Sequence, residues 1–180
     1  MAANKTRIVI GLGLFFAAAS MAQKYTSDGE FVIPSDYREW IFLTSGIGMT
    51  YSNTPNAHPS FGNVFVNPAS YKAFLETGTW PDKTVLLIED RASDSKPSNK
   101  EGRFQTKFTG FEAHVKDSSH GGWQFYMVMD GRSSAKPFAK QEVCRDCHNK
   151  NAAVDTTFLQ FYPTLIDAAK KNGTWHEPPE

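Results

Sequence analysis

The chain is poor in cysteine and carries no excess charge of either sign. Only 2 Cys occur among 180 residues, too few for the disulfide framework of a small secreted scaffold. The 19 Lys and Arg residues balance 19 Asp and Glu residues, so the positive surface that neutralises phosphates is missing. We therefore expect no nucleic-acid partner. The 40% hydrophobic and 13% aromatic content indicates a globular chain.

The sequence has one long apolar run, at the N-terminus, and no second one. Basic residues precede the uncharged apolar residues 8–19, and Ser20 and Ala22 supply the small side chains of a cleavage site. An apolar helix of about 12 residues rises ~18 Å, short of the ~30 Å bilayer core, which favours a signal peptide over a membrane anchor. We predict that residues 1–22 are a cleaved signal peptide, that the protein is periplasmic, and that residues 23–180 form a single domain.

The middle of the chain combines strand and helix signals. Residues 60–66 are β-branched and aromatic, as strands are. Asn67 and Pro68 then favour the start of a helix, and Gly78 favours its end. Residues 84–88 are an uninterrupted apolar run of strand length, so we expect both faces of this strand to be covered.

The second half of the chain predicts further strands and then helix. Residues 92–102 are polar without periodicity, which indicates a surface loop. Residues 111–115 alternate apolar with polar, and residues 123–129 form a second strand, with Met127 and Met129 on its buried side. Apolar residues then recur at helical spacing. The pattern predicts an α+β domain with a predominantly antiparallel β-sheet and flanking helices.

Both cysteines belong to one short motif, Cys144-Arg145-Asp146-Cys147-His148. In an exported protein, C-x-x-C-H is the attachment signature of c-type haem, in which two thiols add to the porphyrin and the adjacent imidazole binds the iron. We predict one covalent haem c, held by Cys144 and Cys147 and ligated by His148. A zinc site, a thioredoxin-like redox pair and an inert disulfide are the alternatives. The missing second ligand pair disfavours zinc, and the position near the C-terminus disfavours a thioredoxin-like pair.

The ligand on the iron face opposite His148 decides what such a haem does. A Met or a second His there gives a six-coordinate electron carrier, whereas an open face binds external ligands. The strand pattern favours a core role for Met127 and Met129 and a solvent-facing position for His114. The side chains that could supply a sixth ligand are Met49, Met127, Met129, His58, His114 and His120.

Several separated motifs resemble the cytochrome P-460 family, which includes the cytochromes c-prime beta. They are PSDYREW at 34–40, NVFVNPASYKAFLETGTWPDKTVLLIED at 63–90, GWQFY at 122–126, and CRDCH followed by FYP at 161–163. The resemblance implies a predominantly antiparallel β-sheet with flanking helices, one c-type haem per subunit and a homodimer. It also implies a five-coordinate iron with His148 as the proximal ligand and an open distal side.

Two activities divide that family, and the resemblance places this chain with one of them. Members that oxidise hydroxylamine carry a Lys cross-linked to the haem, and a distal carboxylate can assist proton transfer. Ile88 stands at the position of that Lys, and Lys83, the nearest Lys, has the opposite pleat parity. Residues 136–140, before the haem motif, hold no carboxylate, although Glu142 is close by.

The resemblance thus implies an apolar distal pocket, like that of the members that bind nitric oxide and carbon monoxide. We expect Ile88 in the distal wall and Phe61 as the candidate aromatic cap, although strand parity does not distinguish Phe61 from Phe65. Such a pocket admits neutral diatomic gases but supplies no general base. The favoured function is a cytochrome that binds nitric oxide or transfers electrons to an unidentified redox partner. The alternative is a hydroxylamine or nitric oxide oxidoreductase.

The motif and the export signal together predict a haem that cannot be extracted. After maturation in a host that assembles c-type cytochromes, acid–acetone treatment should leave the colour with the protein, because thioether bonds survive acid. Colour in the organic phase would contradict attachment through Cys144 and Cys147.

Overall fold

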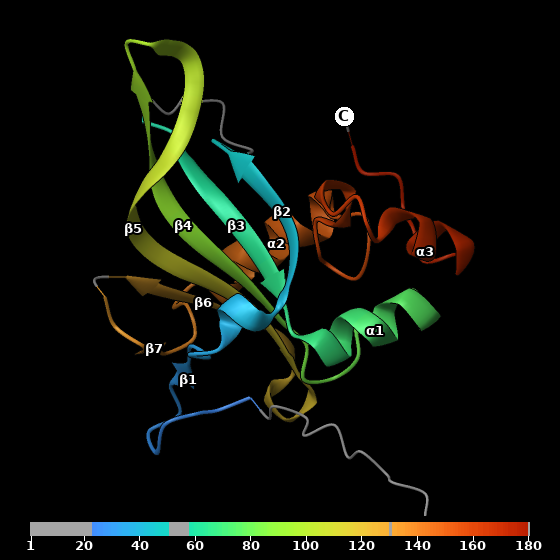
Figure 1. Ribbon diagram of the computed structural model, residues 1–180. Helices are drawn as coiled ribbons and strands as arrows, with labels where there is room; N and C mark the ends of the chain where they lie inside the picture. Colours follow the sequence, from blue (N-terminus) through green and yellow to red (C-terminus); the bar gives the residue numbers. More distant parts are fainter. Residues whose placement is uncertain (1–22, 51–57, 130, 180) are drawn as a thin grey trace, which may run out of the picture.

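A computed structural model describes residues 23–50, 58–129 and 131–179 of the chain (Figure 1). The proposed signal peptide, residues 1–22, lies outside the described residues. Among the helices of the described part, none is long and apolar enough to cross a membrane. The strands are β1 (Phe31–Val32), β2 (Ile41–Ile47), β3 (Ser60–Val66), β4 (Val85–Lys96), β5 (Asn99–Asp117), β6 (Gly122–Met129) and β7 (Ser134–Ala135). The α-helices are α1 (Pro68–Thr77), α2 (Gln141–Asn151) and α3 (Ile166–Lys171), and 3-10 helices span Tyr37–Glu39, Ser118–His120 and Leu159–Phe161.

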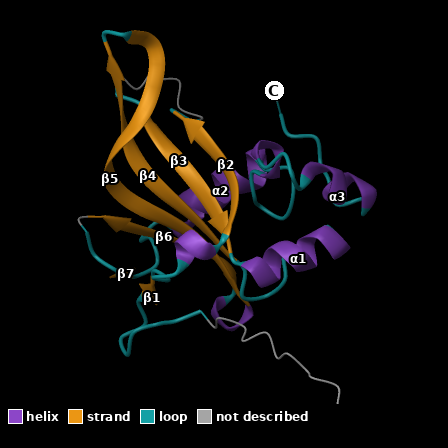
Figure 2. Ribbon diagram, in the orientation of Figure 1, coloured by secondary structure: helices purple, strands orange, loops and turns teal. Residues whose placement is uncertain are grey.

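The main sheet has five strands in the order β2-β3-β4-β5-β6, and every neighbouring pair is antiparallel. Strands β1 and β7 form a separate antiparallel pair. The α-helices gather to one side of the sheet, and the β1–β7 pair lies toward the other (Figure 2). This arrangement confirms the α+β class with a mostly antiparallel sheet.

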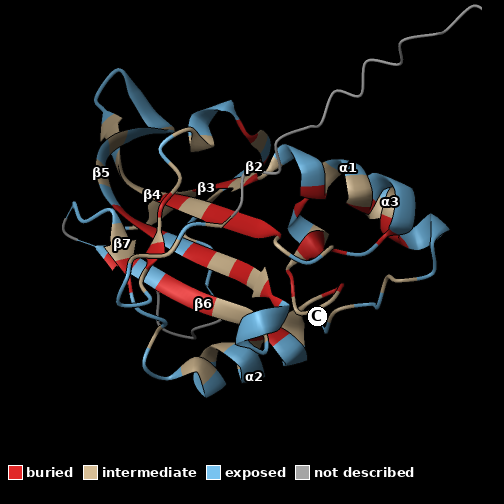
Figure 3. Ribbon diagram, turned by 90° about the horizontal axis from the view of Figure 1, so that it is seen from below, coloured by how far each residue is buried: buried red, intermediate tan, exposed pale blue. Residues whose placement is uncertain are grey.

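The two faces of the sheet belong to two separate hydrophobic clusters. On one face, Val66 and Leu86 pack with α1 and the C-terminal segment. On the other, Leu87 and Ala113 pack with Phe31 of β1 and its neighbours. Strand β4 is therefore covered on both faces, as the apolar run at 84–88 predicts, and buried residues run along the sheet strands (Figure 3).

Helix α1 begins at Pro68 and is followed by Gly78 at φ +69°, which agrees with the sequence signals. Asn67, however, does not cap the helix with its side chain. Its Oδ1 accepts a hydrogen bond from the Val85 backbone N–H at 2.8 Å, and its Nδ2 donates to Ser70 Oγ at 2.9 Å. Asn67 thus ties the start of α1 to the start of β4.

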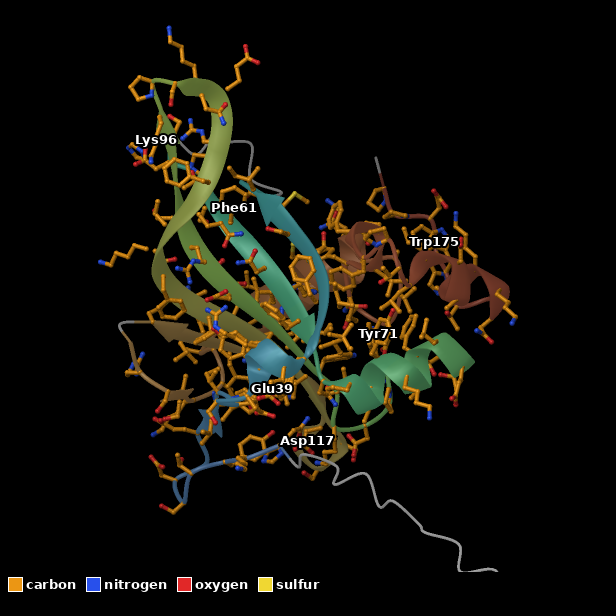
Figure 4. All side chains as sticks on the ribbon, viewed as in Figure 1. Glu39, Phe61, Tyr71, Lys96, Asp117 and Trp175 are labelled. Carbon is orange, nitrogen blue, oxygen red and sulfur yellow. The ribbon has the colours of Figure 1, made fainter. Side chains whose placement is uncertain are left out.

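The predicted surface loop at 92–102 is wrong, because β4 and β5 continue as a long hairpin through it. Ser93 pairs with Gln105, and Lys96 pairs with Asn99, so the turn is short. The hairpin projects from the sheet, with Lys96 near its tip (Figure 4). The backbone N–H and C=O groups of these two strands bond to each other, and both faces of the hairpin lie toward solvent. The sequence therefore shows no apolar periodicity there.

Two further expectations for the second half of the chain also need correction. In β6, Met127 and Met129 are exposed, so their expected core role is wrong; they share a face with the buried Phe125, and Met127 lines the smaller cavity with it. The helical spacing around 158–166 yields only a 3-10 turn and the short helix α3. Pro163, which cannot continue a helical hydrogen-bond ladder, lies between them.

A buried carboxylate holds β4 in place on the face covered by β1 and β7. Glu89 is 2% exposed, and its Oε1 accepts hydrogen bonds from Arg38 Nη2 at 2.5 Å, Arg91 Nη1 at 2.9 Å and Tyr37 Oη at 3.2 Å. Because side chains alternate along a strand, this network directs Ile88 and Asp90, the neighbours of Glu89, to the opposite face.

We predict that Glu89→Gln lowers the free energy of unfolding by about 1–3 kcal/mol, because two arginines lose a buried counter-charge. Urea unfolding of the haem-loaded protein measures the change. Glu101→Gln, at an exposed position of β5, is the matched control and should shift stability by under about 0.5 kcal/mol. Equal effects of the two variants would show that the network does not stabilise β4.

Candidate functional site

Helix α2 presents the three residues of the predicted haem motif on one side. Cys144, Cys147 and His148 are three and four positions apart, so they share a helix face. Both thiols are free, and all three side chains line a cavity of about 210 Å³ between α2 and β6. The structure thus brings the motif residues together at one cavity.

Gln141, the first residue of α2, fixes this helix against the sheet. Its Oε1 accepts a hydrogen bond from the Phe125 backbone N–H at 2.9 Å, and its Nε2 donates to the Phe125 carbonyl at 2.6 Å. The side-chain amide therefore pairs with β6 as another strand would. The Phe125 ring also packs on His148, with ring centroids 4.9 Å apart.

His148 is oriented by a hydrogen bond to a backbone carbonyl. Its Nδ1 lies 2.7 Å from the Thr156 carbonyl oxygen, and because a carbonyl only accepts, Nδ1 carries the proton. Nε2 is then left with a free lone pair, the form in which histidine binds metals. Burial lowers the pKa of His148 despite the hydrogen bond to Thr156, which favours the neutral ring.

The turn that carries the Thr156 carbonyl has an unusual backbone. Asp155 and Thr156 lie at φ +43° and +58°, in the left-handed region that non-glycine residues rarely adopt. Lys116 Nζ on β5 holds the Asp155 carboxylate at 2.7 Å, and Trp80 Nε1 donates to Thr157 Oγ1 at 2.9 Å. Contacts from the sheet thus stabilise a strained turn, as is common where a side chain must be positioned for function.

A second, larger cavity of about 760 Å³ adjoins the first and shares Glu112, His114 and His148 with it. Its volume falls in the range of cofactor sites, roughly 300–1,000 Å³. Gly62 on β3 leaves space there, since a Cβ at this position would stand 3.2 Å from Ile88 Cγ2. Two free thiols, a neutral imidazole with an open Nε2 and these adjoining cavities fit a haem bound through the motif.

Ile88 and Phe61, the two expected distal residues, lie in different places. Ile88 lines the larger cavity together with His148. Phe61 does not: Gly62 and Val64 line this cavity, and Phe61 has the opposite parity on β3, so its side chain is directed to the other face. This corrects the assignment of Phe61 as the aromatic cap. The aromatic residues that line the cavity are Phe158, Phe161 and Tyr162.

The expectation of a purely apolar pocket is also corrected. Asp90 and Glu112 line the larger cavity beside Ile88. Burial, together with the nearby charges of Glu112 and Glu89, raises the pKa of Asp90 to about 7, and burial raises the pKa of Glu112. The alternation at 111–115 predicts that Glu112 lies on the wet face of its strand, and Glu112 is indeed exposed; what the alternation does not indicate is that this face lines the cavity.

Among the possible sixth ligands, His114 and Met49 line the larger cavity. The His114 ring contacts the His148 ring, with centroids 4.4 Å apart, and burial and His148 lower the pKa of His114 well below its usual value. Met49 is 58% exposed at the cavity edge. Met127 lines only the smaller cavity, and Met129, His58 and His120 line neither.

Comparison with known proteins supports the same interpretation as the geometry. The family model described as Cytochrome P460 matches residues 34–159, well over half of the chain. This span includes Ile88, the cysteines and His148. No curated protein matches the chain significantly.

We predict that Ile88→Lys places an amine against the haem, because residue 88 lines the same cavity as His148. A covalent link should then appear as a mass change on the haem peptide and as a red-shifted ferrous Soret band. The control is Leu87→Lys, which puts the amine on the opposite face of β4 and should form no link. A soluble, haem-loaded Ile88→Lys protein with an unchanged haem peptide would contradict the placement.

Proposed function

The chain belongs to the cytochrome P460 family of haem-binding cytochromes, and on that premise we propose a periplasmic monohaem c-type cytochrome that binds nitric oxide or a similar small gas. Cys144 and Cys147 hold the haem covalently, and His148 binds its iron from the proximal side. The haem supplies an iron that binds diatomic ligands and exchanges electrons. We propose five-coordinate iron, with one face open to the ligand.

The observation that carries this proposal is the arrangement around His148. Its Nδ1 is committed to the Thr156 carbonyl, so Nε2 serves the iron. His114 contacts the His148 ring itself, which supports a place beside His148, because two imidazoles on opposite faces of an iron are separated by the macrocycle. Gly62, Val64 and Ile88 then offer small or apolar surface to a gas molecule.

A second candidate function is oxidation of hydroxylamine or nitric oxide. Asp90 and Glu112 favour it, because carboxyl groups with raised pKa values can accept protons near neutral pH. Ile88 disfavours it, since the resemblance gives the hydroxylamine-oxidising members a cross-linking Lys at this position. We therefore rank gas binding first.

For assembly, we propose a symmetric homodimer and an unidentified redox partner. Phe42 on edge strand β2 and Met129 on edge strand β6 expose apolar surface for a second subunit to cover. The family resemblance motivates the dimer more strongly than these side chains do.

The ferrous spectrum and its carbon monoxide adduct test the function. We predict an ordinary high-spin spectrum that carbon monoxide converts to a low-spin adduct, because the distal face of the iron is open. Sharp α and β bands without gas binding would show a six-coordinate electron carrier. A broad, red-shifted Soret band would show a cross-linked haem and favour the oxidoreductase.

A further inference from the structure

Two carboxylates face the larger cavity from neighbouring strands, and we call Asp90 and Glu112 the acidic wall. Ile88 pairs with Glu112, and Asp90 pairs with Gly110, so Asp90 is the diagonal neighbour of Glu112 on one sheet face. Both side chains line the cavity that contains His148. A Cβ at Gly62 would stand 3.8 Å from Asp90 Oδ1, so the missing side chain leaves the space before Asp90 open.

Neither carboxylate of the acidic wall has a hydrogen bond or ion pair within the described part of the chain. The buried carboxylates Glu89 and Asp117 do have partners there: Glu89 binds two arginines, and Asp117 binds Lys83. Asp90 is half-buried, and Glu112 is exposed where it lines the cavity. With no partner in the described part of the chain, the charges of both carboxylates act on whatever enters the cavity.

Within the described part of the chain, no Lys or Arg lines the larger cavity beside the acidic wall. The two basic side chains that do line it are His114 and His148, whose rings contact each other. The remaining lining is polar without charge, small or apolar, and the titratable cysteines lie at the smaller cavity.

An anion that enters this cavity meets the negative charges of both carboxylates. Like charges that line one protein site repel strongly enough to change binding on the order of tenfold. A neutral gas meets no such penalty. Resting on the proposed open haem, we propose that Asp90 and Glu112 are specificity-determining residues that exclude anions from the iron and admit small neutral ligands.

The test compares an anion and a neutral ligand on the ferric, haem-loaded protein at pH 8. Sodium azide and nitric oxide are titrated separately, and the haem absorbance reports binding. Asp90→Asn and Glu112→Gln remove one charge each without a change of shape. Asp94→Asn and Glu101→Gln remove the same charges at exposed positions of β4 and β5, outside the cavity, and are the matched controls.

We expect each wall variant to bind azide about tenfold more tightly than the wild type, and the double variant more tightly still. Nitric oxide affinity should change less than about twofold, and both control variants should bind azide like the wild type. Unchanged azide affinity in the double variant would overturn the proposal. An equal gain for azide and nitric oxide would overturn it too, because the side chains would then act by obstruction.

The nitric oxide titration of the wild type separates this proposal from the proposed function. If the wild-type iron binds nitric oxide but the azide results fail, the gas-binding function stands and the acidic wall has no part in selection. If the wild-type iron takes up neither ligand, the open haem is refuted, and the proposal falls with it.

Discussion

The hydrogen bond from His148 Nδ1 to the Thr156 carbonyl is the interaction on which the site depends. It selects the tautomer with a free Nε2 and fixes the direction in which this nitrogen points. The carbonyl is available because Asp155 and Thr156 adopt positive φ values, and Lys116 holds Asp155 in that conformation. One strained turn, anchored to the sheet, therefore sets the position of the proposed iron ligand.

Strand β4 is the second constraint, because the alternation of its side chains decides which of them line the cavity proposed to hold the haem. Glu89 is fixed by Arg38 and Arg91 on one face, so the residues on either side of it, Ile88 and Asp90, must face the cavity. The same strand thus presents an aliphatic side chain and a carboxyl group to one ligand. Because Asp90 adds a carboxylate beside Ile88, the proposed pocket has a charge preference that an apolar pocket would not have.

Sequence alone predicts the features that depend on local spacing. The C-x-x-C-H motif, the helix that begins at Pro68 and the covered strand at 84–88 are all found where their patterns place them. One error at the site concerns the choice between the two faces of a strand. The assignment of Phe61 rests on alternation, which gives a period of two without an absolute direction. Only the register of β3 to β6 shows which side meets the cavity.

The central claim is that His148 is the only protein ligand of an otherwise open haem iron, and resonance Raman spectroscopy of the ferrous protein tests it most directly. The account predicts the iron–imidazole stretching band of five-coordinate, high-spin iron. This band should disappear in His148→Gly and return when imidazole is added. A low-spin, six-coordinate spectrum in the wild type, or a band that persists unchanged in His148→Gly, would contradict the account.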